Sequence, residues 1–342
     1  RQNDLNNSGM MTRSMRGRMI MVGLIVFMLL AMPVAAQQRV VPPPDPIPAE
    51  LNDYYWNLRT DNRYWWDSVL CGCPPLNNLG YVIKSRSFFS PYKEFEWLKF
   101  SILHDAGKSG TEDSKMAGEY LSTEVINPIL KYRALRLEDG SILTYNDIAK
   151  KYAYKNLDRE SLDRLVTAEL LYYYSRDYIV FPNPNKNPDD MMASMALPYV
   201  LAFPCETVSM QKGICWNQNI ALATLYEMMG YDVALYLVPA SPMPPYPTGA
   251  YHAVVLLKDE GWGIGDWESA RDSMGNDIPG RYIVLDPMYD ASFMEGKPPS
   301  EALGSMGLEF GQPSPYLTAP LGIFSKIFNY IPGIQAIFIG KI

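Results

Sequence analysis

Cys215 is the residue whose type and surroundings most clearly indicate chemistry. It stands in the run Gly213-Ile214-Cys215-Trp216, and the apolar spacing that follows predicts a helix over 216–229, ended by Gly230. A thiol at a helix N-terminus has a lowered pKa, because unpaired backbone N–H groups and the helix dipole favour the thiolate. A thiolate attacks carbonyl carbon, so the pattern predicts a nucleophile, with Gly213 leaving room for a substrate.

Two further residues are predicted as the base and the acid for this thiol. Residues 231–238 alternate apolar residues with others, which predicts a strand, and residues 251–257 are predicted as a second strand with His252 near its start. A third short strand over 281–285 leads directly to Asp286. We expect His252 to accept the thiol proton and Asp286 to orient the imidazole, which completes a Cys-His-Asp triad.

The stretches around these residues resemble the transglutaminase-like superfamily of papain-related fold. Its prokaryotic members show a proline-x-glutamate-threonine stretch and then a glycine-x-cysteine motif, which residues 204–207 and 213–215 match. Histidine-alanine and aspartate-proline pairs follow in the family, and residues 252–253 and 286–287 match them. The similarity spans roughly residues 160–295 and resembles prokaryotic members, and the N-terminal segment described below predicts that this one is exported.

The resemblance implies an α+β fold, in which the nucleophile helix packs on an antiparallel sheet and a mostly helical region precedes it. It implies a triad of Cys215, His252 and Asp286, in which the Cys215 thiolate attacks amide or ester carbonyls. The thioacyl intermediate then passes its acyl group to water or an amine. Peptide hydrolysis is the first expectation, and protein cross-linking by acyl transfer is the second. We expect a protein or peptide substrate, with no metal or other cofactor.

Two departures from the family pattern leave another class of function open. Ile214 and Trp216 stand where many prokaryotic relatives carry acids beside the cysteine. An insertion over 261–280 separates the histidine from the aspartate of the triad, and it holds Asp266, the reserve candidate for the acid. The alternative is a non-catalytic surface module that keeps the fold as a binding or structural scaffold.

Charge and cysteine content exclude several classes of protein. A formal net charge of −7 gives no basic face for nucleic acid, so we expect no nucleic-acid partner. Four cysteines are too few to form a disulfide scaffold in a chain of 342 residues. Cys71 and Cys73 form half of a metal knuckle, but no second cysteine pair or nearby histidine completes it. A disulfide, with Cys205 as one candidate partner, is the better interpretation in an exported protein.

The N-terminal segment has the layout of a secretory signal peptide. Arg13, Arg16 and Arg18 precede an uncharged apolar run over 19–36, which ends in small residues. If it is not cleaved, this run of about 18 residues is marginally long enough to anchor the chain in a membrane. In both cases we expect an extracytoplasmic protein that is secreted or anchored at the cell surface.

Periodicity elsewhere predicts helices without assigning them chemistry. Apolar spacing predicts a helix over 117–135, which Pro128 must kink or break, and a second helix over 161–178. The polar run His104–Lys108 is interpreted as a loop. For the strongly apolar stretch 316–342, three alternatives remain open: packing on the core, lying in a membrane interface, and spanning the membrane.

These patterns divide the chain into five parts. We expect a signal peptide or N-terminal membrane anchor over 1–36, a proline-rich linker over 37–50, a helical N-terminal region over 51–150, a transglutaminase-like domain over 151–300, and an apolar C-terminal tail over 301–342. The linker contains five prolines between Val40 and Pro48, which favour an extended, semi-rigid spacer.

Overall fold

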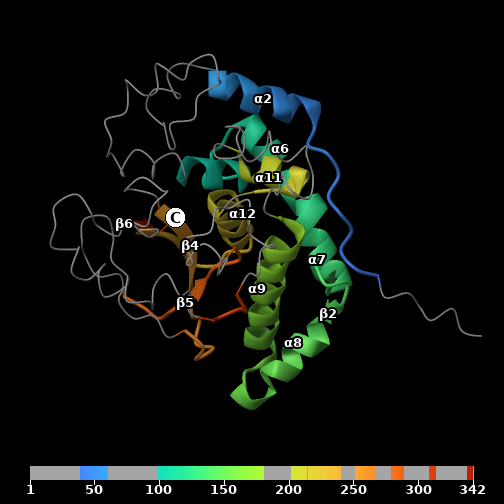
Figure 1. Cartoon of the computed structure of the whole chain (residues 1–342), viewed down its shortest axis with the longest axis vertical. Coiled ribbons are helices and arrows are strands. Elements are labelled where there is room, and N and C mark those ends of the chain that lie inside the picture. The colour runs from blue at the N-terminus through green and yellow to red at the C-terminus, as the bar shows by residue number, and fades with distance from the viewer. Residues whose placement is uncertain are drawn as a thin grey trace, which may run out of the picture. The chain divides into compact units, whose positions relative to one another are not determined.

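The computed structural model describes eight stretches of the chain, which are residues 39–60, 99–180, 202–213, 215–239, 251–265, 279–288, 308–312 and 337–341. Contacts divide the chain into the units Arg1–Arg39 and Val40–Ile342, and every described residue except Arg39 belongs to the second unit. In the described stretches that unit has seven labelled α-helices, a further helical stretch over residues 99–105, and two small antiparallel sheets (Figure 1). This mixture of helix and antiparallel sheet agrees with the predicted α+β class.

The described residues of the predicted linker are extended and lie against the folded unit. Residues 39–48 contain no helix or strand, and α2, Ala49–Thr60, follows them. Val41 is buried, its N–H donates to the Ala134 carbonyl at 3.0 Å, and its carbonyl accepts from the Tyr178 hydroxyl at 2.8 Å. The described part of this segment therefore packs on the folded unit through Val41.

A buried polar pair ends the next helix, which covers residues 99–105. His104 and Asp105 are both fully buried, and their Nδ1 and Oδ1 atoms lie 2.7 Å apart. Asp105 also accepts from the Tyr55 hydroxyl at 2.7 Å and from the Cys205 N–H at 2.8 Å. The prediction of a loop at His104 is thus wrong, because internal hydrogen bonds allow this polar pair to be buried within a helix. The chain turns only afterwards, at Gly107.

Pro128 interrupts a long helix, as the sequence predicts. The helix begins at α6, Glu112–Leu121, passes through a π-helical turn, Ser122–Ile126, and continues as α7, Asn127–Tyr132. Proline has no N–H, and its ring clashes with the carbonyl four residues earlier. The π turn, where the Asn127 N–H donates to the Ser122 carbonyl, accommodates this break.

A short hairpin and the longest described helix follow. The hairpin strands β1, Ala134–Arg136, and β2, Ile142–Thr144, pair antiparallel, and then come α8, Tyr145–Lys151, a 3-10 turn, Ala153–Lys155, and α9, Arg159–Tyr178. The helix predicted over 161–178 is confirmed by α9. It starts slightly earlier because the Asp158 carboxylate accepts from the Ser161 N–H at 2.7 Å and caps the first turn.

The sheet that receives the predicted nucleophile helix has the strand order β5-β4-β3-β6, with every neighbouring pair antiparallel. Its strands are β3, Val233–Pro239, β4, Tyr251–Lys258, β5, Tyr282–Leu285, and β6, Ile337–Lys341. Two helices precede these strands in the chain, α11, Pro204–Met210, and α12, Cys215–Met228. The structure confirms the three strands and the helix that were predicted between residues 216 and 285.

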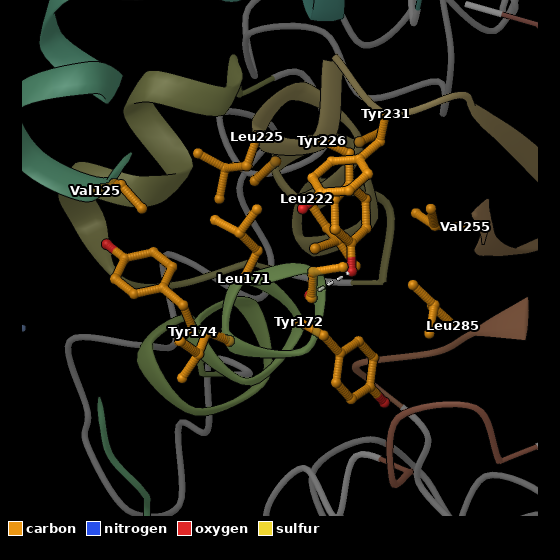
Figure 2. Close-up of a cluster of buried hydrophobic side chains, with 14 of the residues drawn as sticks. Val125, Leu171, Tyr172, Tyr174, Leu222, Leu225, Tyr226, Tyr231, Val255 and Leu285 are labelled. Carbon is orange, nitrogen blue, oxygen red and sulfur yellow. Dashed lines mark hydrogen bonds between the residues drawn. The ribbon is translucent and has the colours of Figure 1, made fainter. Parts of the chain in front are cut away.

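The main core lies between α9, α12 and one face of this sheet. Figure 2 shows the packing of Leu171 and Tyr172 from α9 with Leu222, Leu225 and Tyr226 from α12, next to Val255 and Leu285 from the strands. All seven side chains are at most 1% exposed. The helix α12 contacts α9, α11, β3 and β4, so it is packed from several directions (Figure 1).

The described parts of the predicted C-terminal tail pack on this fold. Strand β6 pairs with β3, and Leu308 and Phe310 are buried. The Tyr172 hydroxyl donates to the Leu308 carbonyl at 2.6 Å. The other residues of the tail lie outside the described part of the chain, as do residues 1–38 with the predicted signal peptide or anchor. Among the described residues, no helix is both long and apolar enough to cross a bilayer.

Candidate functional site

The first residue of α12 is Cys215, where the sequence places the nucleophile. The turn before it is tied to the end of α9 by backbone hydrogen bonds on both sides of Lys212. The Val180 N–H donates to the Gln211 carbonyl at 3.0 Å, and the Gly213 N–H donates to the Val180 carbonyl at 3.1 Å. At its other end α12 is closed by Gly230 in the left-handed conformation (φ 71°), as predicted.

Gly213 is required by close packing in front of the helix. A Cβ atom at this position would lie 2.7 Å from the Asn217 Cβ and 3.2 Å from the Thr207 Cγ2. Side chains of the protein itself fill the space on the Cβ side of Gly213, and the expectation that this residue leaves room for a substrate stays a prediction. The same packing assigns a role to the proline-x-glutamate-threonine stretch. Thr207 contacts this turn, and the Glu206 carboxylate accepts from the Phe203 N–H at 2.9 Å to cap α11.

The two described thiols have contrasting environments. Cys215 is free and partly exposed, whereas Cys205 is free and fully buried. Burial, and secondly the charge of Asp105, raise the pKa of Cys205, and its thiol donates to the Ala117 carbonyl at 3.5 Å. A disulfide to Cys205 is therefore not formed, and of these two thiols only Cys215 is available to a reagent or substrate in solution.

Asn219 links the start of α12 to the strand that carries His252. Its side-chain nitrogen donates to the Cys215 carbonyl at 2.7 Å and to the Ala253 carbonyl at 2.9 Å. Both neighbours are acceptors, so the amide must present its NH₂ group to them. Asn219 is fully buried, and one side chain therefore joins the backbone of the predicted nucleophile to the backbone next to the predicted base.

His252 is the second residue of β4, and its backbone is paired with that of Val238 on β3. The structure thus brings the strand position of His252 beside the start of α12 through the contact of Asn219 with Ala253. The imidazole itself lies outside the described part of the chain. The pairing of this imidazole with the Cys215 thiol stays a prediction.

Asp286 directly follows β5, as the sequence predicts. The adjacent Leu285 is paired with Val255 on β4, so the aspartate leaves the sheet next to the strand of His252. Asp286 is fully buried, and its carbonyl accepts from the Tyr172 hydroxyl at 3.1 Å. The reserve candidate, Asp266, lies outside the described residues.

The sequence patterns did not indicate two residues that hold this site, Tyr172 and Asn219. Each lies within a helix whose apolar spacing predicts only that the helix packs on the core. A signal for Asn219 does exist, because it comes one helical turn after Cys215 and is therefore on the same side of the helix. Tyr172 gives no comparable signal, since its partners Asp286 and Leu308 are far away in the sequence.

Metal chemistry and known relatives give no further assignment. In the described stretches, no three His, Cys, Asp or Glu side chains gather as a metal site requires, and the Cys71–Cys73 pair lies outside those stretches. No protein-family model, curated protein or solved structure matches the chain. The site is therefore interpreted from its own residues and geometry.

Proposed function

We propose that this chain is an exported cysteine enzyme of the transglutaminase-like superfamily, and that it hydrolyses peptide bonds in protein or peptide substrates. The observation that carries the proposal is the free, partly exposed thiol of Cys215 at the first residue of α12. Unpaired N–H groups at a helix start stabilise a thiolate, the nucleophilic form of cysteine. The antiparallel strands β5-β4-β3 in contact with this helix support the proposal, because the resemblance implies a nucleophile helix packed on an antiparallel sheet.

The proposed reaction uses three side chains. His252 takes the proton of the Cys215 thiol, and the sulfur attacks the carbonyl carbon of the substrate. The C–N bond then breaks, the amine leaves with the proton from His252, and a thioester remains on Cys215. A water molecule, deprotonated by His252, attacks the thioester and releases the acid and the free thiol. Asp286 holds the imidazole in the required orientation.

A captured acyl intermediate tests the proposal. The protein is mixed with an activated peptide ester, quenched in acid and digested, and the peptide that contains Cys215 is examined by mass spectrometry. We expect an added acyl mass that hydroxylamine removes and that His252→Ala abolishes. The matched control is Cys205→Ser, which keeps Cys215 and must still be acylated. Absence of the acyl adduct in the parent protein would support the non-catalytic scaffold instead.

The acceptor decides between hydrolysis and cross-linking. The same experiment is repeated with a fluorescent primary amine in excess over the peptide ester. Release of the free acid without incorporation of the amine supports hydrolysis. Transfer of the acyl group to the amine, at the expense of the acid, supports the cross-linking alternative.

Export is proposed from the N-terminal layout of arginines and apolar residues over 13–36. Fractionation of cells that produce the complete chain, followed by intact-mass measurement, tests it. We expect the protein outside the cytoplasm, with a mass that lacks the apolar run. A full-length mass in the membrane fraction supports the anchored form, and a full-length cytoplasmic protein contradicts export.

A further inference from the structure

Asn219 is the buried side chain that connects the proposed nucleophile to the strand of the proposed base. Its amide donates to two carbonyls from different elements, those of Cys215 on α12 and Ala253 on β4. The first of these bonds closes within one helical turn. The second crosses from the helix to the sheet, so the two bonds together set the distance between the start of α12 and β4.

The crossing bond lies where the sheet offers β4 less support. The last described pair between β4 and β5 joins Val255 to Leu285, and Ala253 lies two residues beyond it. At this position Asn219 supplies a hydrogen bond from the helix instead. Asn219 and its bond to the Ala253 carbonyl are buried, so loss of the amide removes a link between helix and sheet that water does not replace.

We infer that Asn219 is a positioning residue, which holds the Cys215 backbone and the β4 backbone at His252 in the spacing that thiol-to-imidazole proton transfer requires. This inference rests on the proposed function. The amide touches neither the thiol nor the substrate, and it acts through the two carbonyls. Proton transfer needs hydrogen-bond contact between the two groups, so a displacement of α12 by about 1 Å relative to β4 slows the reaction on the order of 100-fold.

The test is Asn219→Leu, which has a similar volume and no donor. The rate of Cys215 alkylation by iodoacetamide is measured against pH, with the Cys215 peptide resolved by mass spectrometry. In the parent protein we expect fast alkylation that persists below the ordinary thiol pKa of about 8.5. In Asn219→Leu we expect that acidic limb to be lost, with alkylation at least about tenfold slower near pH 6.5.

A matched variant separates positioning from stability. Thr224 lies on the same helix, is fully buried, and donates to the Ile220 carbonyl at 2.8 Å without leaving α12. Thr224→Val therefore removes a buried hydrogen bond of the helix but no link to β4. We expect it to lower the melting temperature and to keep the parent pH profile. If Asn219→Leu also keeps the parent pH profile of Cys215 alkylation and loses only stability, the inference is overturned.

Two further results complete the test. If Asn219→Leu does not fold, Asn219→Ser replaces it, because serine is smaller and cannot bridge both carbonyls, and the same loss of the acidic limb is expected. A parent protein whose alkylation rate simply follows an ordinary thiol pKa contradicts the proposed function itself. If the parent protein shows the acidic limb and Asn219→Ser keeps it, only the role of Asn219 is contradicted.

Discussion

The packing at Gly213 yields the sharpest prediction about how the fold presents the thiol. In Gly213→Ala the new methyl group lies 2.7 Å from the Asn217 Cβ, a distance that real Cβ atoms essentially never show, and 3.2 Å from the Thr207 Cγ2. The Asn217 Cβ is fixed to the backbone of the first turn of α12, so no rotamer change relieves the contact. The start of the helix must shift by several tenths of an ångström.

The cost of such overpacking is about 1–3 kcal/mol. For the folded unit Val40–Ile342, each kcal/mol lowers the melting temperature by about 1.5–2 °C. We therefore expect Gly213→Ala to melt roughly 2–6 °C below the parent protein. We also expect its Cys215 alkylation rate to change, because the shifted turn leads directly into that residue.

Gly230→Ala is the matched control at the opposite end of α12. A Cβ there meets no atom within 4 Å, but the left-handed conformation strains it, so stability falls while the helix start stays in place. Circular dichroism gives the melting temperatures, and peptide mass spectrometry gives the alkylation of Cys215. The reasoning is refuted if Gly213→Ala is as stable as the parent protein and its thiol reacts at the parent rate.

Three further predictions concern thiols, charge and a buried hydroxyl. Maleimide should label Cys215 in the folded protein and Cys205 only after unfolding, because Cys205 is fully buried and its pKa is raised; equal native labelling would contradict this. Burial raises the pKa of Glu169 above its ordinary 4.5, although Lys151 and Tyr152 oppose the shift. The folded state therefore holds this proton more tightly, and the stability it contributes is present below pH 4.5 and lost as pH rises through the folded pKa. Urea unfolding should show the parent losing stability relative to Glu169→Gln as pH rises, and a gain would show the sign to be wrong. Tyr172→Phe should lower the unfolding free energy by about 1–3 kcal/mol in urea, because the Asp286 and Leu308 carbonyls lose a buried donor; no loss would rule out that role.

The elements that carry the proposed site follow from local sequence patterns. The helix after Cys215 is visible in its apolar spacing and in Gly230, a residue that tolerates the left-handed conformation needed to end it. The strands show alternation, and Asp286 marks where β5 ends. Such signals lie within a few residues of the feature they specify, so they can be read without knowledge of the fold.

The features that were missed depend on partners that are distant in the sequence. The polar run around His104 predicts a loop, but Tyr55 and Cys205, from two other helices, surround the Asp105 carboxylate that it contacts. The sequence shows the flexibility of Gly213, whereas the contacts with Asn217 and Thr207 explain why no larger residue fits there. The spacing of apolar residues along the sequence does not indicate such contacts. They become visible only when the helices and strands are assembled.

The central claim, that Cys215 works with His252, is tested most directly by the titration of the imidazole. The chain has two histidines, so selective labelling gives two sets of ring resonances in NMR, and buried His104 serves as the internal reference. Spectra are recorded between about pH 5 and 9 for the parent protein and for Cys215→Ala. A thiolate beside the imidazole favours its protonated form, so we predict that His252 titrates at a higher pH in the parent than in Cys215→Ala. Identical titration of His252 in the two proteins would contradict the claim.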